Sequence, residues 1–151
     1  MEFAKILREV YANSLDGIVI TDANSVILDV NPAYEAITGY TREELIGKKT
    51  NILRSGQTPR EVFEDMWKQL NEHGRWVGEL INRRKDGSLW HSFLSITKVY
   101  TESGEVFYVG LSRDITARRR MEEDLRENLR VLEEARRAAD ASARILRSII
   151  E

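Results

Sequence analysis

Hydrophobic residues recur with a helical period at both ends of the chain. Near the start, the apolar positions fall three and four residues apart, at Phe3, Ile6, Leu7, Val10 and Tyr11. This spacing places them on one side of a helix, so residues 1–14 predict an amphipathic N-terminal cap helix. From residue 15 to residue 116 short β-rich runs and short helical segments alternate, which predicts one mixed domain over 15–116.

The first part of that domain predicts a β-hairpin followed by two short helices. Two β-rich runs, DGIVITD and SVILDV, flank the turn sequence DANS. Asn31 is the expected N-cap of the next helix, and Pro32 fits the first helical position. Thr41 and Glu44 have the spacing of a capping box, which predicts a second short helix.

A longer amphipathic helix is predicted between Thr58 and Gly74. Thr58 is the expected N-cap, Glu61 completes a capping box with it, and the glycine ends the helix. The apolar residues in between form one inward stripe: Val62, Phe63, Met66, Trp67 and Leu70. Such a stripe either packs into a core or lines a ligand pocket, and the spacing alone does not separate the two.

Three strands are predicted after Gly74, joined by the turn sequences KDGS and TESGE. They cover residues 75–84, 88–100 and 105–115. Each run is rich in β-branched and aromatic residues and is bounded by turn-forming residues, which is typical of antiparallel hairpins. With the earlier hairpin, the chain therefore supplies five strands.

Alternation along a strand divides its side chains between two faces. On the first of these three strands, Trp76 and Asn82 fall on one face. On the second strand, His91 and Phe93 share a face, and Trp90 lies on the opposite one. We expect Trp76, Asn82 and His91 to face the covering helices, and Trp90 to face away from them.

Residues 117–151 predict a long helix that forms a coiled coil. They contain neither glycine nor proline, and helix-forming residues dominate. Apolar or small residues alternate in steps of four and three over about four heptads. This seam consists of Met121, Leu125, Asn128, Leu132, Ala135, Ala139, Ser142, Leu146 and Ile149. Leucine occupies one set of core positions, while Asn, Ala and Ser weaken the other. Such a seam suits a homodimer that is able to shift register or rotate better than it suits a maximally stable rod.

A short internal echo links the two ends of the chain. The sequence AKILREV at 4–10 returns as ARILRSI at 143–149. The echo predicts that a second copy of the same module begins there, although a match of this length also arises by chance.

Composition narrows the function classes. The chain has no cysteine and only two histidines, His73 and His91, which excludes disulfides, thiolate chemistry and histidine-rich metal sites and fits a cytoplasmic location. The formal net charge of −2 argues against nucleic acid as the main partner. No apolar run approaches the roughly 18 residues that cross a bilayer, so we expect no direct membrane insertion. The sequence has no phosphate loop, nucleophile elbow or metal-ligand spacing, so we do not expect an enzyme.

The segment INRRKDG poses a choice between two kinds of site. Its three basic residues, Arg83, Arg84 and Lys85, form either a patch for a polyanion or an exposed hairpin tip. Given the charge balance, we favour the exposed tip and assign the site to the preceding amide, Asn82. A carboxamide carries donors and an acceptor together, so it pairs with the polar edge of a ring; its alternative is a bond to the hairpin backbone.

The order of these elements and motifs resembles the PAS family. The motifs are NPAYEAITGYTREELIGK, W-x-G-E followed by NRRKDG, YVG and the terminal RDIT, and together they cover about residues 13–116. The resemblance implies an α+β fold, with a five-stranded antiparallel sheet, helices over one face and a pocket between them. It also implies a sensor of small molecules, light or redox state that signals through flanking helices to an output domain.

Within the family, the segments NILRSGQTPREVFEDMW and RWVGELINRRKDGSLW most resemble the flavin-binding branch, which includes aerotaxis receptors and nitrogen-fixation redox sensors. The positions that this resemblance implicates in FAD binding are Asn31, Arg54, Phe63, Trp76 and Asn82. The blue-light branch implies a second flavin-contacting position at His91. Its reactive cysteine corresponds to Thr50 and its signalling glutamine to Ser112, so photoadduct chemistry is not expected here.

Each candidate residue also has a structural interpretation. Trp76 and Phe63 fit a hydrophobic core, and an inward His91 fits a hydrogen-bonded core residue. Arg54 caps a helix as readily as it holds a phosphate. The resemblance therefore adds a ligand to an arrangement that the fold alone also explains.

We predict a cytoplasmic PAS module that binds FAD and relays redox or oxygen state through a dimeric coiled coil to an output domain, in two-component or cyclic-di-GMP signalling. Asp114 and Thr116 are the expected caps of the exit helix and the joint through which the sheet moves it. One alternative is a cofactor-free dimerisation and relay module, its pocket filled by Trp76 and Phe93. Another is a pocket for haem or a small metabolite, although His73 lies in a last helical turn, where solvated histidines are common.

Overall fold

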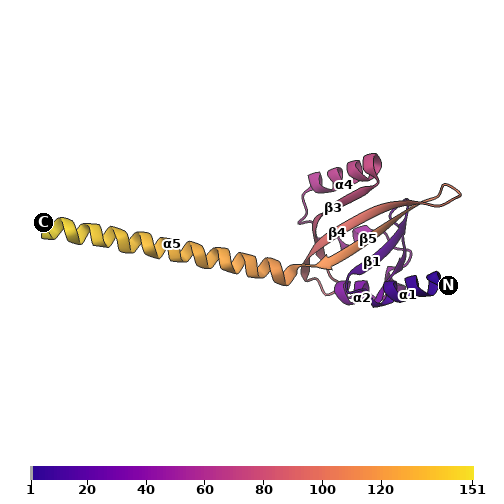
Figure 1. The fold of residues 1–151 in the computed structure, drawn as a ribbon, viewed down its shortest axis with the longest axis horizontal. Helices are drawn as coiled ribbons and strands as arrows, with labels where there is room; N and C mark the ends of the chain where they lie inside the picture. Colours follow the sequence, from indigo (N-terminus) through magenta and orange to yellow (C-terminus); the bar gives the residue numbers. More distant parts are fainter. Residues whose placement is uncertain (1) are drawn as a thin grey trace. The chain divides into compact units, whose positions relative to one another are not determined.

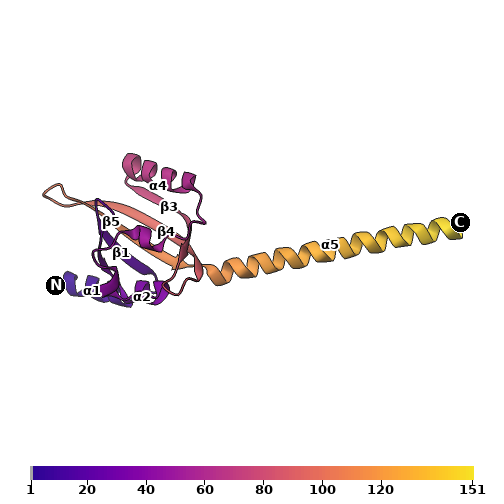
Figure 2. The same cartoon turned by 180° about the vertical axis from the view of Figure 1, so that it is seen from behind.

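The computed structural model describes residues 2–151 and divides the chain into two compact units, which meet after Thr116. Figures 1 and 2 show the first unit from opposite sides, as a twisted sheet with helices. Its elements are α1 (Phe3–Asn13), β1 (Gly17–Asp22), β2 (Ile27–Val30), α2 (Pro32–Thr38), α3 (Arg42–Leu45), the 3-10 helix η1 (Thr50–Leu53), α4 (Arg60–His73), β3 (Arg75–Arg83), β4 (Leu89–Tyr100) and β5 (Val106–Asp114). The second unit belongs to one helix, α5 (Thr116–Ile150).

The five strands form one sheet in the order β2-β1-β5-β4-β3, and every neighbouring pair is antiparallel. The predicted α+β architecture is therefore confirmed. In Figure 1, α4 runs alongside β3, while α1 and α2 lie by β1 at the other side of the sheet. The last strand, β5, leads into α5 and lies in the middle of the sheet, between β1 and β4.

Buried side chains on the helix-covered face form two separate groups. The first lies where α2 and α3 meet β1 and β2, and contains Val19, Ile27, Val30, Tyr34, Leu45 and Leu53. The second lies where α4 meets β3 and β4, and contains Met66, Leu70, Trp76, Leu80 and Tyr108. Different helices cover the two ends of this face, so the core is divided into two groups. Neither group fills the middle of the face.

Glycine at position 78 allows the indole of Trp76 to lie across its own strand. A Cβ atom at Gly78 would stand 2.2 Å from Cζ2 of Trp76, which no side chain contact tolerates. The indole N–H donates to a carboxylate oxygen of Asp65 on α4 at 3.3 Å. Trp76 therefore ties β3 to α4 as part of the core.

Most of the predicted helix ends are correct. Asn31 caps α2 with Pro32 in its first turn, and Thr41 and Glu44 form the expected capping box of α3. Gly74 ends α4 in the left-handed conformation, with φ 71°. The predicted cap at Thr58 is wrong: α4 begins at Arg60 without a side-chain cap, because the Thr58 hydroxyl bonds to the backbone of Ile81 instead.

The register between β3 and β4 reverses the predicted orientations of two side chains. Asn82 pairs with Trp90 and Ile81 pairs with His91, and directly paired residues share a face. Trp90 is therefore on the inner face with Asn82, where it is fully buried, and His91 lies on the outer face. Phe93, 41% exposed, is on the outer face as well and cannot fill the pocket.

The turn between β3 and β4 explains this error. The Arg84 N–H donates to the Ser88 carbonyl at 2.8 Å, which closes a three-residue turn and fixes which residues oppose one another. Alternation within one strand gives the two faces of that strand only. The face of the following strand depends on turn length, and a change of one residue exchanges its faces.

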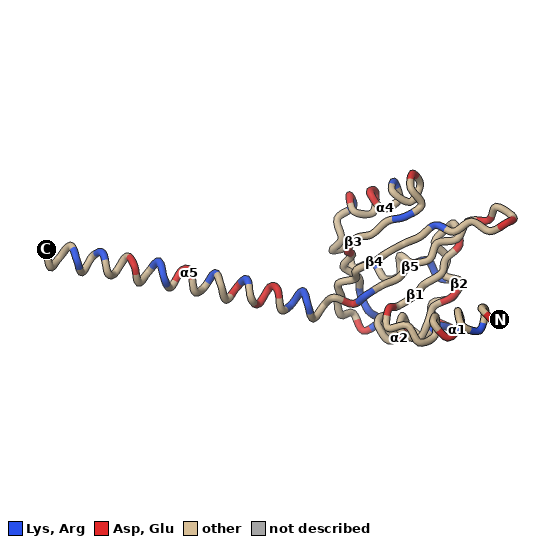
Figure 3. The backbone as a smooth tube through the Cα atoms, viewed as in Figure 1, with Lys and Arg blue, Asp and Glu red and all other residues tan. Residues whose placement is uncertain are grey.

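The helix α5 is covered with charges of both signs along its whole length (Figure 3). Several of them pair within the helix at three- and four-residue spacing, such as Arg130, which is 2.6 Å from both Glu127 and Glu134. Such exposed pairs contribute little to stability individually, because water and salt screen them, but they support an isolated helix. None of the helices within residues 2–151 combines the length and the apolar character needed to cross a bilayer.

Candidate functional site

A cavity of about 260 Å³ lies between the two buried groups. Its walls include Val19, Tyr34 and Leu53 from the first group and Leu80 and Tyr108 from the second. Apolar walls with a few polar side chains are typical of sites for small organic molecules. The space that the sheet and helices leave between them is therefore a candidate ligand pocket.

Asn82 brings an unpaired amide to this cavity. It lines the wall from β3, near the end of the strand, and it is half-buried. Its carboxamide makes no hydrogen bond within residues 2–151. The alternative role, a hydrogen bond from the Asn82 amide to the hairpin backbone, is therefore not observed among these residues. Two donors and one acceptor are thus available to a ligand, and a partly buried amide gains about 1–3 kcal/mol when these groups are paired.

The segment before α4 is fixed to the edge of the sheet beside Asn82. Arg54 forms an isolated β-bridge with Asn82, and the Ser55 hydroxyl donates to the carbonyl of Ile81. The Thr58 hydroxyl accepts from the Ile81 N–H at 2.9 Å. β3 is an edge strand, so these contacts also satisfy backbone groups that would otherwise face solvent.

Arg54 and Phe63 stand together at the border between this cavity and a second hollow of about 430 Å³. The Arg54 guanidinium carbon is 4.3 Å from the centre of the Phe63 ring, a cation–π distance. Arg60 also lines the second hollow and pairs with Glu64 at 3.0 Å. Both hollows share Arg54, Phe63 and Trp67, so a ligand could extend from the apolar cavity to a basic, more exposed end.

Three of the six predicted site residues line the cavity, namely Arg54, Phe63 and Asn82. Trp76 lies on the same sheet face but belongs to the core group under α4. His91 lies on the outer face, so the prediction that it joins Asn82 is wrong. Asn31 is fully buried at the start of α2, away from the cavity walls, and its amide serves the backbone.

The Asn31 carboxamide holds three segments together. Its oxygen accepts the backbone N–H of Ile18 at 2.8 Å and that of Tyr34 at 3.0 Å. Its NH₂ group donates to the carbonyls of Tyr11 and Asp16, each at 3.0 Å. One side chain thus connects the end of α1, the start of β1 and the start of α2.

Several cavity residues were not assigned to the site from the sequence. Thr50 and Ser112, which correspond to functional positions of the blue-light branch, both line the cavity. Trp67 and Tyr108 also line it and contact each other edge to face, with ring centres 5.6 Å apart. Burial raises the pKa of Tyr34, another wall residue, so its hydroxyl keeps its proton at neutral pH. Alternation would have placed Ser112 and Tyr108 on one face, but only the register shows which face is covered.

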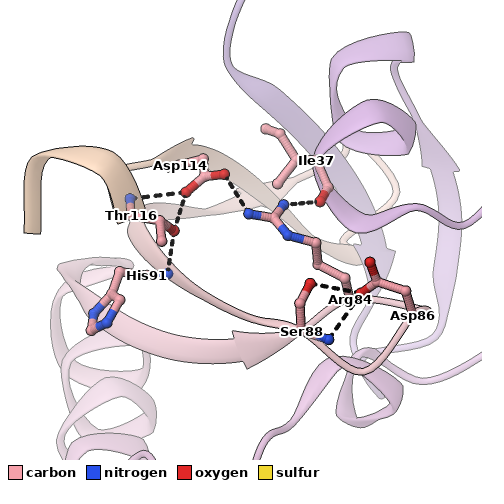
Figure 4. Close-up of polar contacts among 7 residues, drawn as sticks. All are labelled: Ile37, Arg84, Asp86, Ser88, His91, Asp114 and Thr116. Atoms are coloured by element: carbon pink, nitrogen blue, oxygen red, sulfur yellow. Dashed lines mark hydrogen bonds and ion pairs between the residues drawn. The ribbon is translucent and has the colours of Figure 1, made fainter. Parts of the chain in front are cut away.

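A polar junction connects the β3–β4 turn to the start of α5 (Figure 4). Arg84 donates to the Ile37 carbonyl and pairs with Asp114 at 2.8 Å. The other carboxylate oxygen of Asp114 accepts the Thr116 N–H at 3.0 Å and the Thr116 hydroxyl proton. That hydroxyl oxygen in turn accepts a hydrogen bond from the backbone N–H of His91 at 2.9 Å. Asp114 and Thr116 therefore lie at the start of α5, as predicted, and their role as a joint that moves this helix stays a prediction.

The basic triplet is not a uniform exposed tip. Arg83 and Lys85 are exposed, and Lys85 pairs with Glu44 at 2.6 Å. Arg84 is different, because only 24% of its side chain is accessible and its guanidinium lies over the Trp90 ring at 5.7 Å. The prediction of an exposed tip is wrong for Arg84, whose partner Asp114 is 30 residues away in sequence.

The variant Asp114→Asn should lose stability in a pH-dependent way. Partial burial opposes ionisation of Asp114, but hydrogen bonds from Thr116 and Arg84 outweigh it and lower the pKa of the carboxyl from its ordinary value. A lowered pKa adds stability above the unfolded-state pKa, and this is lost as the pH falls through the folded-state pKa. We expect the variant to be about 1–2 kcal/mol less stable at pH 7, and the gap to close below about pH 4.

Urea denaturation of both proteins between pH 7 and pH 3 measures this gap. The same exchange at the exposed Asp140 of α5 is the control and should leave stability unchanged at every pH. A gap for Asp114→Asn that stays constant down to pH 3 would show that its charge contributes nothing at the junction.

A sheet that encloses a cavity beneath helices and continues into a long helix is the arrangement of a sensor-type domain. A family model described as the PAS fold matches residues 5–115, so the chain belongs to the PAS family. The PAS domain of a protein from Colwellia psychrerythraea has a crystal structure with a TM-score of 0.71 and 27% identity, covering 77% of this chain and 99% of that one.

Two curated relatives carry the same type of domain within longer proteins. The nitrogen fixation regulatory protein of Klebsiella oxytoca is 38% identical over 117 residues, which are 77% of this chain and 24% of that protein. The aerotaxis receptor of Escherichia coli is 39% identical over 67 residues, 44% of this chain and 13% of the receptor. The chain thus spans about a quarter or less of these relatives. It is a PAS sensory signalling module, as predicted.

Proposed function

We propose that this module binds FAD non-covalently and reports redox or oxygen state. The observation that carries the proposal is the unpaired carboxamide of Asn82 in the wall of a mostly apolar cavity. It is supported by similarity to proteins named for nitrogen fixation regulation and aerotaxis. FAD, when bound, supplies a ring system that takes up and releases electrons and protons reversibly.

The residues present fit both parts of such a cofactor. The apolar walls and the Trp67 and Tyr108 rings suit a flat aromatic ring, and Asn82 suits its polar edge. The cavity of about 260 Å³ is too small for the whole molecule, since drug-sized ligands occupy roughly 300–1,000 Å³. The second hollow, with Arg54 and Arg60, suits the diphosphate because guanidinium groups bind phosphate well.

The same strand provides a route from the cavity to α5. Asn82 is two residues from Arg84, which holds Asp114 at the polar junction. A change in the hydrogen bonds made by the Asn82 amide would shift the end of β3 and alter the position of Arg84. Asp114 and Thr116 would pass that change to the start of α5, and a coupling of about 1–3 kcal/mol suffices to bias two states of a helix pair.

In the proposed protein, two copies pair through α5 in the cytoplasm and act on an output domain elsewhere in the same chain. The seam described from the sequence lies on this helix, which is continuous from Thr116 to Ile150. The output domain defines the signalling pathway, either two-component or cyclic-di-GMP. The PAS module itself would carry out no catalysis.

The absorbance spectrum of the purified chain tests the proposal. We expect a yellow protein with a flavin band near about 450 nm, either as isolated or after incubation with FAD. Release of the chromophore by heat, followed by chromatography, identifies it as FAD or as a smaller flavin. A protein that is folded by circular dichroism but stays colourless after incubation with FAD would instead support the cofactor-free relay module, and a haem spectrum would support an oxygen sensor of another kind.

A further inference from the structure

Two polar groups on the inner face of the sheet are fully buried and have no hydrogen-bond partner among residues 2–151. They are the indole N–H of Trp90 and the hydroxyl of Ser92, two residues further along β4. Both residues are 0% exposed. Buried polar groups in folded proteins are nearly always paired, because an unpaired one has given up its hydrogen bonds to water without replacing them. The two groups therefore point to a partner that the side chains around them do not supply.

A third polar group, the carboxylate of Asp114, lies beside them. Ser92 and Asp114 are directly paired residues of β4 and β5, so their side chains share the inner face. The Arg84 guanidinium lies over the Trp90 ring at 5.7 Å. The same guanidinium pairs with Asp114 at 2.8 Å, as Figure 4 shows. Trp90, Ser92 and Asp114 therefore belong to one corner of the sheet, next to Arg84.

We propose that this corner binds one buried water molecule between Trp90, Ser92 and Asp114. The water accepts the indole N–H, exchanges a hydrogen bond with the Ser92 hydroxyl and donates to the Asp114 carboxylate. Three hydrogen bonds are usual for a buried water, and folded proteins hold about one such water for every 27 residues. The proposal goes beyond the proposed function, because the site belongs to the folded domain and does not depend on a cofactor.

The hydrogen-bonding properties of the three groups select water as the occupant. An indole N–H only donates, so the occupant must accept a hydrogen bond, which a metal cation cannot do. An ionised carboxylate only accepts, so the occupant must also donate, which excludes chloride. A serine hydroxyl does both and places no further restriction. Water meets both conditions and is small enough to lie between packed side chains.

The spacing of the strands fits a single bridging molecule. The Cβ atoms of directly paired residues such as Ser92 and Asp114 are about 4.5–5.5 Å apart in an antiparallel sheet. A water that makes two hydrogen bonds of about 2.8 Å each joins polar atoms that are separated by a similar distance. Ser92 is also much smaller than Trp90 and Leu94, its neighbours along the inner face, so the layer of side chains is thinnest at its hydroxyl.

This water would connect the floor of the cavity to the start of α5. On the inner face Ser92 has Leu80 and Leu94 as neighbours, and both line the cavity. On its other side, Asp114 accepts the backbone N–H of Thr116 at 3.0 Å, at the first residue of α5. The central strand β4 would thus have a link to this helix of its own, in addition to the ion pair at the polar junction.

The variant Ser92→Ala tests the site in the full chain without any cofactor. Loss of a hydroxyl that bonds to a water should lower the melting temperature by about 3–6 °C, because the water and its other partners lose a contact. Loss of an unpaired buried hydroxyl should instead leave the melting temperature unchanged or raise it. Ser95→Ala, the same exchange on the outer face of the same strand, is the matched control and should have no effect.

Nuclear magnetic resonance of the natural chain detects the water directly. We expect the indole proton of Trp90 to show cross-relaxation with a water molecule that tumbles with the protein. The variant Trp90→Phe identifies this proton among the three tryptophans, because its signal disappears. Ser92→Ala should weaken the cross-relaxation, and Ser95→Ala should leave it unchanged.

Hydrogen exchange measures the link to α5. The backbone N–H of Thr116 donates to Asp114, so loss of the bridging water in Ser92→Ala should make this amide exchange about three- to fivefold faster. The Ser95→Ala control should exchange at the natural rate. An unchanged rate in Ser92→Ala would show that the site does not connect to this helix.

Two results would overturn the water site itself. One is a Ser92→Ala protein that is at least as stable as the natural chain. The other is a Trp90 indole proton without a water signal in the natural chain, which would mean that a protein group satisfies it directly. None of these measurements uses FAD, so a colourless protein that shows the water signal removes the proposed cofactor and leaves this site in place.

Discussion

Replacing Asn31 by alanine should destabilise the folded domain more than removal of any residue that only lines the cavity. The carboxamide is fully buried and makes four hydrogen bonds to the backbone of four different residues. Alanine leaves two N–H groups and two carbonyls without this partner and leaves a space where the amide was. At about 1 kcal/mol for each bond, the free energy of unfolding should fall by about 3–5 kcal/mol.

Thermal and urea denaturation without any cofactor measure this loss directly, and a melting temperature lower by about 15–25 °C is expected. The variant Asn31→Asp keeps the oxygen that accepts from Ile18 and Tyr34 but lacks the NH₂ group, and it places a negative charge near two carbonyls. It should therefore also be unstable. Asn71→Ala, an exposed position on α4, is the matched control. If Asn31→Ala melts like the control but binds FAD more weakly, Asn31 is a cofactor contact, as the family resemblance implied.

Local signals in the sequence were sufficient for most helix ends. The caps at Asn31 and Thr41 depend on residues three positions apart, so the pattern and the structure describe the same contacts. The stop at Gly74 is similar, because a left-handed residue is needed wherever a helix ends in this way. Strand positions were also predictable, since β-rich runs were bounded by clear turns.

Contacts between distant segments were not predictable by this route. The inward Trp90 and outward His91 follow from the pairing of β3 with β4, which a single strand does not encode. The Thr58 hydroxyl bonds to the backbone of Ile81 instead of capping its own helix, and Arg84 pairs with Asp114 of a strand that is distant in sequence. In each case a long-range contact displaced the local one.

The candidate site shows the same division. Arg54, Phe63 and Asn82 were identified by resemblance, and the structure brings all three to the cavity. Resemblance also selected Asn31 and Trp76, whose contacts here are those of a cap and a core residue. A family motif records the residues that maintain the fold together with those that touch a ligand, and only the contacts separate them.

The substitution Asn82→Leu should weaken FAD binding while leaving the domain at least as stable. Leucine has nearly the same size but offers neither donors nor an acceptor, so the polar edge of the ring would lose its partner. Loss of one or two hydrogen bonds in a partly buried site costs about 1.5–3 kcal/mol, which raises the dissociation constant by roughly 10–100-fold. Titration of the protein with FAD, followed by flavin absorbance or fluorescence, gives this constant.

Stability in the absence of FAD provides the second half of this test. The Asn82 amide has no hydrogen-bond partner among residues 2–151, so leucine removes no contact from the cofactor-free domain and adds apolar surface to an apolar cavity. Its melting temperature should therefore equal or exceed that of the natural chain. Asn71→Leu, the same exchange on the surface of α4, should change neither quantity. An Asn82→Leu protein that binds FAD as tightly as the natural chain would remove the amide from the site, and one that is strongly destabilised would show that Asn82 maintains the fold.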